Sequence, residues 1–221
     1  MNRQVALAAL GMAVLAGCAG VPVARPAAPG QVVGTDADSP QAMAQRQRIE
    51  RLGLADGDCS APAWALTGRV ALSNGKDGGS GRITWSQAAS EARIELTAPV
   101  TRQGWALDVD ADGATLQGVP GGPVHGADAA ALLRERTGWD IPVAGLGCWV
   151  RGAWASEAAF GLATVGYGED GRVQRIEQAG WTIDYADWKP DAASGADLPA
   201  RITALRNTDR VRLVVDRWAV D

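Results

Sequence analysis

The chain has 221 residues, of which 47% are hydrophobic and 21% are charged, a composition that excludes a wholly disordered protein. Its formal net charge is -4 and its arginines are scattered among acidic residues, so it shows no basic stretch typical of a nucleic-acid-binding protein. The length is that of one folded domain with additional segments.

Residues 1–17 predict an export signal peptide. Arg3 supplies a positive start, the apolar run "VALAALGMAVL" follows at 5–15, and the small residues Ala16 and Gly17 come next. This run is shorter than the stretch of about 20 apolar residues that a membrane-spanning helix needs. We therefore expect residues 1–17 to be removed on export.

The signal ends at "LAGC", residues 15–18, which resembles a bacterial lipobox. This resemblance implies cleavage before Cys18 and attachment of acyl chains to it, so Cys18 is the expected lipidation site. Ala19 stands where an aspartate is associated with retention at the inner membrane, so we expect a lipid-anchored protein on the periplasmic face of the outer membrane. Residues 18–38 are rich in Ala, Pro and Gly, which predicts a lipidated N-terminus and a flexible tether.

The folded domain is expected over residues 39–221, and its first element is a helix. Ser39 followed by Pro40 is typical of a helix start, and the helix should end at Gly53. The side expected to pack on a sheet carries Met43, Arg46, Ile49 and Leu52. A helix free in solvent is the less favoured alternative, because short helices gain most of their stability from packing.

Beyond Cys59 the hydrophobic residues alternate with a period of two, which predicts β-strands. An antiparallel meander is expected in "WALTGRVAL", "RITW", "ARIELTAP", "GWALDVD" and "ATLQGV", with the glycine-rich "SNGKDGGSG" as its first turn. Asp128 then caps a short helix that ends at Gly138, and "PVAGLGCWVRG" predicts a second apolar turn of helix.

Alternation resumes in "GLATVGY", "GRVQRIEQ", "WTIDYADW", "PARITAL" and "RVRLVVDRW". A count of about 9 to 11 strands with few helices predicts a mainly β domain, in which one strongly curved antiparallel sheet forms an incomplete barrel covered by short helices. Such a sheet leaves a concave apolar face.

The sequence lacks a recognisable catalytic or metal-binding constellation. His125 is the single histidine, it lies in a loop rich in Gly and Pro, and no "GxSxG" turn is present to supply a nucleophile. Paired carboxylates such as those in "DVDAD" fall at expected turns, where solvated acids are usual. We therefore expect no enzyme, no metal site and no cofactor, and an envelope hydrolase that uses His125 is the alternative.

Cys59 and Cys148 are the two cysteines that remain once Cys18 carries lipid. An exported protein meets oxidising conditions, in which two such thiols can form a disulfide. The alternative is a pair of buried thiols whose Cα atoms lie too far apart to be joined.

Five blocks of sequence, in this order behind the lipobox, closely resemble the LolB family, whose members are outer-membrane lipoprotein receptors. The blocks are "WALTGRVALSNGKDGGSGRITW" (64–85), "TAPVTRQGWAL" (97–107), "ALLRERTGWDIPVAGLGCWVRG" (131–152), "GWTIDYADW" (180–188) and "LPARITALRNTDRVRLVVDRW" (198–218). They span nearly the whole expected domain, and the "GWDIPV" sequence before the second helix is the most distinctive.

The resemblance implies a hydrophobic cavity that accepts acylated lipoproteins from the periplasmic carrier LolA, and insertion of this cargo into the outer membrane. It also implies that a loop between early strands promotes insertion; here the loop is "APVTRQG", with Pro99 and Val100 at its apolar tip. The expected partners are LolA, the lipoprotein cargo and outer-membrane lipid. We expect a monomer that binds no nucleic acid.

Alternation along the strands indicates which side chains face the concave side of the sheet. The expected cavity residues are Leu66, Val70, Ile83, Trp85, Leu96, Trp105, Leu107, Leu132, Leu133, Ile141, Leu146, Trp181, Ile183 and Leu213. Each can instead be an ordinary core residue. The competing hypothesis is therefore a structural or scaffolding envelope lipoprotein without a ligand cavity.

Overall fold

The structure, a computed structural model, describes residues 36–54, 57–60, 62–98 and 104–220. The expected signal peptide, the lipidation site Cys18 and the loop residues Pro99 and Val100 lie outside these ranges. The predictions made for them therefore stay predictions.

Within the described ranges the chain forms eleven strands and four helices. The strands are β1 (Trp64–Ser73), β2 (Gly78–Ala88), β3 (Glu91–Thr97), β4 (Gly104–Asp110), β5 (Gly113–Gln117), β6 (Val124–Gly126), β7 (Thr164–Tyr167), β8 (Val173–Gln178), β9 (Trp181–Pro190), β10 (Asp197–Arg206) and β11 (Asp209–Val220). The helices are α1 (Pro40–Arg51), α2 (Ala129–Thr137), α3 (Val143–Trp149) and α4 (Glu157–Phe160).

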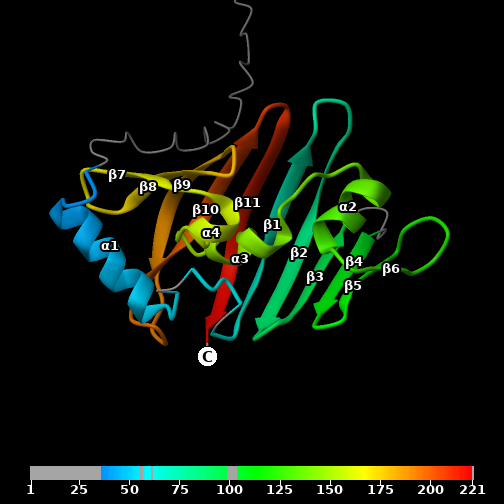
Figure 1. The fold of residues 1–221 in the computed structure, drawn as a ribbon, viewed down its shortest axis with the longest axis horizontal. Coiled ribbons are helices and arrows are strands. Elements are labelled where there is room, and N and C mark those ends of the chain that lie inside the picture. Colours follow the sequence, from blue (N-terminus) through cyan, green and yellow to red (C-terminus); the bar gives the residue numbers. More distant parts are fainter. Residues whose placement is uncertain (1–35, 55–56, 61, 99–103, 221) are drawn as a thin grey trace, which may run out of the picture.

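All the strands belong to one antiparallel sheet, with the order β6-β5-β4-β3-β2-β1-β11-β10-β9-β8-β7. The edge strands β6 and β7 are not paired with each other, so the sheet is not closed into a barrel. Helices α2, α3 and α4 lie across one face of the sheet, and α1 lies near its β7 edge (Figure 1). The predicted mainly β fold, an incomplete barrel covered by short helices, is confirmed.

The first hairpin turn is tighter than the glycine-rich sequence indicates. Strand β1 continues to Ser73, which pairs with Gly78, so residues 78–81 of the expected turn are instead part of β2. The connection is closed by Asn74, whose side-chain oxygen accepts hydrogen bonds from the backbone N–H groups of Lys76 and Asp77. Gly75 supplies the left-handed backbone conformation in this turn, with φ of 84°, so only one of the glycines in the expected turn is used there.

Helix α1 begins as predicted but buries a different side. Ser39 caps it by accepting a hydrogen bond from the amide of Ala42, and Pro40 is its first residue. The predicted buried side was wrong in part, because Met43 is 49% exposed and Arg46 is also exposed. The helix instead buries Ala42, Gln45, Arg48 and Ile49.

Burial of two polar residues on α1 has a physical reason. The amide of Gln45 donates to the carbonyl of Gly152 at 2.8 Å, and the Arg48 guanidinium donates to the carbonyls of Asp197 at 2.8 Å and Gly152 at 3.1 Å. Buried polar side chains are tolerated where such bonds replace water. Helix α1 therefore attaches through hydrogen bonds to the chain beyond α3 and to the start of β10.

Candidate functional site

An apolar cavity lies between the inner face of the sheet and helix α3. Its lining consists only of aliphatic side chains and tryptophan rings, contributed by strands β1 to β4 and β9 to β11, by α2 and α3, and by residues on either side of α3. These residues are Val70, Leu72, Ile83, Trp85, Ile94, Leu96, Trp105, Leu133, Ile141, Val143, Leu146, Trp149, Val150, Trp181, Ile183, Ile202, Ala204, Val211 and Leu213. Such a surface offers burial to hydrocarbon but few bonding partners to a polar ligand.

The cavity is small in this structure. Its volume is about 100 Å³, whereas ligand pockets typically have about 300 to 1,000 Å³, and a cavity of about 150 Å³ is enough for benzene. A space of this volume is too small for a whole acyl chain of about 16 carbons.

The C-terminal end of α3 is held firmly to the sheet and to the segment before β1. The hydroxyl of Tyr185 donates to the carbonyl of Trp149 at 2.8 Å, and the indole N–H of Trp149 donates to Gln178 at 2.9 Å. Cys148 forms a disulfide with Cys59, with the two Cα atoms 4.7 Å apart. This end of α3 is thus fixed by a covalent bond and by buried hydrogen bonds.

Buried Arg151 adds to this attachment. Its guanidinium donates to the carbonyls of Gly147 and Cys59, each at 2.8 Å, and lies 5.1 Å from the centre of the Trp64 ring. Burial lowers the pKa of Arg151 to about 10, so the group remains charged near neutral pH, and nearby Asp58 opposes the shift. Burial also raises the pKa of Tyr185 and keeps its hydroxyl protonated as a donor.

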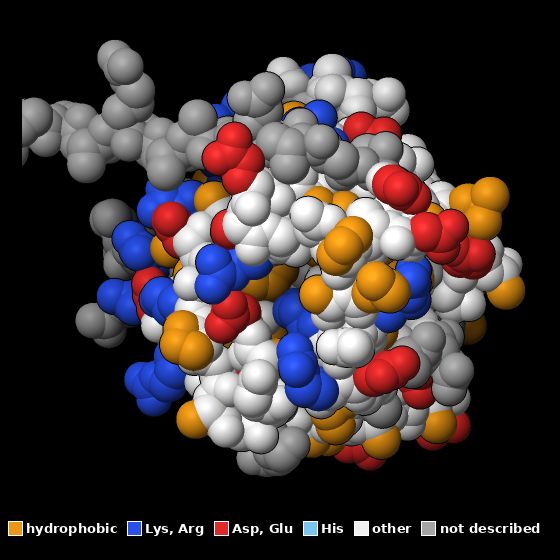
Figure 2. Space-filling view, turned by 90° about the vertical axis from the view of Figure 1, so that its left-hand side faces the viewer, with side chains coloured by type: hydrophobic (Ala, Val, Ile, Leu, Met, Phe, Trp, Pro, Cys, Tyr) orange, Lys and Arg blue, Asp and Glu red, His pale blue; other side chains and the backbone are white. Residues whose placement is uncertain are grey.

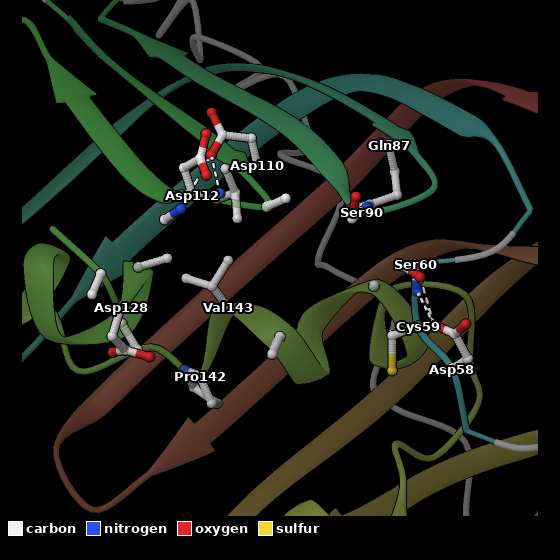
Figure 3. Close-up of a pocket in the computed structure, with 18 of the residues that line it drawn as sticks. Asp58, Cys59, Ser60, Gln87, Ser90, Asp110, Asp112, Asp128, Pro142 and Val143 are labelled. Carbon is white, nitrogen blue, oxygen red and sulfur yellow. Dashed lines mark hydrogen bonds between the residues drawn. The ribbon is translucent and has the colours of Figure 1, made fainter. Parts of the chain in front are cut away.

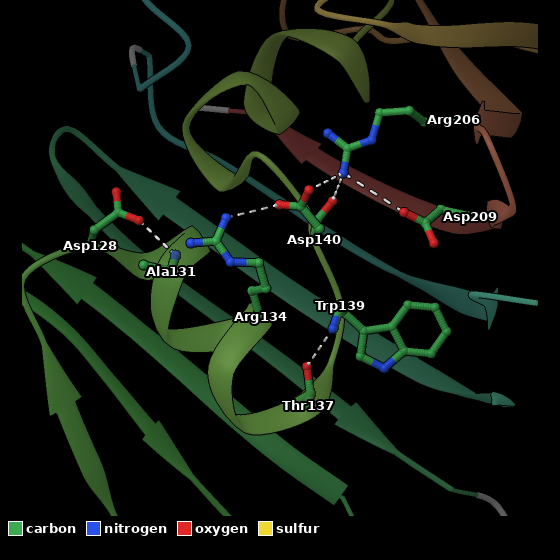
Figure 4. A network of polar contacts seen from close by, with 8 residues as sticks. All are labelled: Asp128, Ala131, Arg134, Thr137, Trp139, Asp140, Arg206 and Asp209. Carbon is green, nitrogen blue, oxygen red and sulfur yellow. Dashed lines mark hydrogen bonds and ion pairs between the residues drawn. The ribbon is translucent and has the colours of Figure 1, made fainter. Parts of the chain in front are cut away.

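The N-terminal end of α3 has a weaker attachment. Pro142 precedes the helix and provides no side-chain cap. The connection from α2 to α3 is held instead by Arg206 at the end of β10, which donates to the carbonyl and the carboxylate of Asp140, both at 2.6 Å (Figure 4). Arg134 approaches Asp140 only to 3.9 Å, so the contact with Arg206 is the principal one.

A wider hollow of about 810 Å³ lies between α2, α3 and the turns that follow β2 and β4 (Figure 3). Carboxylates lie around its rim, contributed by Asp58, Asp110, Asp112 and Asp128. Asp110 and Asp128 accept hydrogen bonds from nearby backbone amides, as turn and cap residues do. Val143 lines both this hollow and the apolar cavity, so α3 separates the two spaces.

Most of the expected cavity residues meet around the apolar cavity under α3. Leu66, Leu107 and Leu132 are exceptions: each is at most 5% exposed, but they pack in the core outside the cavity lining. Alternation along a strand indicates which face a side chain is on, but not how far along that face the cavity extends. The prediction therefore included these three core residues among the cavity residues. That any of the lining residues binds acyl chains stays a prediction.

Several lining residues were missed although the sequence carries a signal for them. Leu72, Ile94 and Val211 lie two residues from Val70, Leu96 and Leu213 and share their faces, and Ile202 and Ala204 alternate in β10. Val143, Trp149 and Val150 were harder to find, because α3 is too short to show a helical period.

His125, the basis of the hydrolase alternative, lies on β6 at the edge of the sheet. Its Nδ1 lies 3.2 Å from the hydroxyl of Thr115, and the contact is exposed to solvent. Among the described residues, no group of three His, Cys, Asp or Glu side chains is arranged to hold a metal ion. None of the described helices combines the length and apolar character needed to cross a membrane.

Comparison with known proteins gives a consistent result. Residues 62–218 match the family model described as outer membrane lipoprotein LolB. The outer-membrane lipoprotein LolB of Xanthomonas campestris pv. campestris strain B100 is 42% identical over 221 residues, covering 99% of this chain and 97% of the relative.

Solved structures are similar in fold at low sequence identity. A DUF1329 family protein from Desulfovibrio piger aligns with a TM-score of 0.50 at 6% identity. The alignment covers 83% of this chain and 94% of the Desulfovibrio chain. A LolA superfamily protein from Nitrosomonas europaea has a TM-score of 0.47 at 11% identity, covering 80% of this chain and 93% of its own.

Proposed function

Because the chain belongs to the LolB family of outer-membrane lipoproteins, we propose that it accepts acylated lipoproteins from the carrier LolA into the cavity under α3 and releases them into the outer membrane. The family membership places its role in lipoprotein localisation and its own site of action at the outer membrane, with a lipid anchor. The cavity lining is the observation that supports the transfer step.

Hydrocarbon burial makes such a receptor necessary. Each CH₂ group that leaves water gains about 0.8 kcal/mol, so one chain of about 16 carbons represents about 13 kcal/mol. An acylated protein therefore does not cross the aqueous periplasm as a free molecule at a useful rate. A receptor with an apolar site can receive the chains directly, and differences in affinity between successive sites can set the direction of transfer.

The attachments of α3 suggest how a cavity of about 100 Å³ becomes large enough. The end that carries Cys148 and Trp149 is fixed, whereas the end at Val143 depends on the contact between Arg206 and Asp140. The wider hollow lies on the other side of Val143. We propose that α3 pivots about its C-terminal end toward this hollow and thereby extends the apolar cavity.

A transfer experiment tests the function. The full-length, lipidated protein in vesicles is mixed with LolA loaded with a labelled lipoprotein, and the label that reaches the vesicles is measured over time. Ala204→Leu places three more carbons into the cavity and should slow transfer at least several-fold. Ala106→Leu is the matched control, because Ala106 lies on the opposite face of the sheet from Trp105 and Leu107.

The outcomes are distinct. Label that stays on LolA with the unmodified protein, while an active family member accepts it, would overturn the transfer proposal. In that case the small volume of the cavity supports the competing hypothesis, in which the protein is a scaffolding lipoprotein with a packed interior. Equal transfer by both leucine variants would show that cargo binds away from this cavity.

A further inference from the structure

A group of arginines lies on the outer face of the sheet, where β2, β1 and β11 are neighbours. We call Arg69, Arg82, Arg210 and Arg212 the arginine patch; all four are exposed. The strand register brings them together, because Arg69 is opposite Arg82, Ala71 is opposite Arg212 and Ser73 is opposite Arg210. Lys and Arg side chains are numerous along the left of Figure 2, on the side away from the helices that cover the inner face.

The patch is short of negative partners. Arg69 pairs with Asp216 at 3.0 Å, but Arg82, Arg210 and Arg212 form no ion pair with any residue that the structure describes. Arg212 is opposite Thr203 on β10, and Thr203 is opposite Asp184 on β9. Asp184 is not available to the patch, because it is already paired with Arg175 at 2.7 Å.

Two other arginines of the outer face are paired with carboxylates. Arg93 binds Glu95 and Asp108 on neighbouring positions, and Arg201 binds Asp187 at 2.9 Å. Uncompensated charge is therefore concentrated on β1, β2 and β11, where Arg217, opposite Thr67, also forms no ion pair with a described residue. It is also opposite in sign to the net charge of the chain, which is -4.

The arrangement includes a contact that is unfavourable for folding. Like charges that are directly opposite on neighbouring antiparallel strands, such as Arg69 and Arg82, destabilise the pair. A shallow groove of about 340 Å³ is lined by Arg69, Arg82 and Arg212, together with Ser80 and Val214. The groove has the size and charge to receive a phosphate group with its neighbouring atoms.

We propose that the arginine patch binds the phosphate head groups of anionic phospholipids in the leaflet that holds the protein's own lipid anchor. The anchor keeps this negatively charged surface within reach, and basic side chains near such a surface are attracted to it. Arginine is suited to phosphate because its planar guanidinium can donate two parallel hydrogen bonds. The contact orients the sheet on the membrane, whether or not cargo is bound.

The orientation follows from the position of the patch in the sheet. Arg82 is opposite Thr97, the last residue of β3, and Arg210 follows the turn between β10 and β11. Docking through the patch therefore directs the start of β2, the end of β3 and the start of β11 toward the lipid head groups. The opposite end, with the turn between β2 and β3, faces away.

Head-group quenching tests the proposal with the lipidated full chain. Ser80→Cys carries a fluorophore on the patch, and Ser90→Cys carries it at the other end of β2 as the control position. The vesicles contain phosphatidylethanolamine with or without phosphatidylglycerol, together with a lipid whose head group bears a quencher. We expect quenching at position 80 to increase with phosphatidylglycerol and to decrease with salt, while quenching at position 90 stays low.

A double variant measures the contribution of the arginines. Arg82→Gln with Arg212→Gln should lower the ratio of docked to undocked protein by about 25-fold, because each basic residue near an anionic surface contributes about fivefold. Arg51→Gln with Arg136→Gln removes the same charge from exposed positions in the last turns of α1 and α2, and should leave quenching unchanged.

Three results would overturn the proposal. The first is quenching at position 80 that is independent of phosphatidylglycerol, and the second is an equal loss in both double variants. The third is unchanged quenching in the patch variant together with slower uptake of cargo from LolA, which would assign the patch to an acidic protein surface. Failure of cargo transfer by the unmodified protein would overturn the transfer function alone, since quenching is measured without cargo.

Discussion

Individual buried polar residues connect the parts of this molecule that hydrophobic patterns alone leave separate. Arg48 and Gln45 attach α1 to carbonyls far along the chain, and Tyr185 attaches α3 to the sheet. Burial lowers the pKa of Arg48 to about 10, which still leaves it protonated at neutral pH. Each such group costs free energy unless it is bonded, so these residues act as specific attachment points.

Tyr185→Phe tests the buried hydroxyl through the pH dependence of stability. Because burial raises the pKa of Tyr185 above its ordinary value of 10.0, the unfolded chain loses this proton first as the pH rises. The stability advantage of the tyrosine is therefore complete below about pH 10 and should then fall by about 1.4 kcal/mol per pH unit.

The measurement is the free energy of unfolding by denaturant at several pH values, for the unmodified protein and Tyr185→Phe. Below about pH 10 the variant should be less stable by about 1 kcal/mol, from the lost hydrogen bond to Trp149. A difference between the two proteins that stays constant up to pH 11 would contradict a buried, protonated hydroxyl.

At the scale of elements, α3 is a short helix with unequal ends. Close packing at its C-terminal end requires a glycine, because a Cβ atom at Gly147 would lie 2.5 Å from the carbonyl oxygen of Cys59. The other end relies on the bond between Arg206 and Asp140, and Arg206 also lies 4.8 Å from the centre of the Trp181 ring. This difference between the two ends is the basis for the proposed pivot of α3.

Arg206→Gln should release this cover. Loss of a charged hydrogen bond is worth about 1.5 to 3 kcal/mol, so the rate at which a fluorescent fatty acid enters the cavity should rise about tenfold or more. Arg134→Gln is the matched control, because Arg134 is 63% exposed and lies 3.9 Å from Asp140. Uptake is measured by rapid mixing, with thermal unfolding recorded for each variant. Equal uptake by both variants would contradict the assigned role of Arg206.

At the scale of the whole molecule, the disulfide joins residues that are 89 positions apart. It connects the segment before β1 to α3, and thus links the N-terminal part of the domain to the helices inserted between the two halves of the sheet. A covalent link across so long a loop restricts the unfolded chain.

Removal of the link in the double variant Cys59→Ala with Cys148→Ala should lower the free energy of unfolding by about 2 to 4 kcal/mol. Urea unfolding with and without reductant provides the measurement. The unmodified protein should lose the same amount when it is reduced, and the double variant should not respond. A reductant effect in the double variant would show that another group is responsible.

The sequence by itself determined ten of the eleven described strands, the starts of α1 and α2 and the two faces of the sheet, because period-two alternation and capping residues act within a few neighbouring positions. Strand β6 and helix α4, which are only three and four residues long, were not predicted. Ser39 and Asp128 cap helices as their types predict, and Ile83, Trp85 and Ile183 alternate inward. These are local signals, and local signals suffice for a sheet whose neighbours along the chain are mostly neighbours in space.

Only the tertiary structure decided which inward residues surround a cavity, which side of α1 is buried and whether Cys59 meets Cys148. Leu66 and Val70 have the same pattern, yet only Val70 lines the cavity, because α3 covers one part of the sheet and not the other. Gln45 and Arg48 are polar, so their residue types alone favour exposure to solvent. They are buried because folding places the carbonyls of Gly152 and Asp197 within hydrogen-bond distance. Contacts between distant positions depend on how all the elements pack at once, and no short stretch of sequence contains that information.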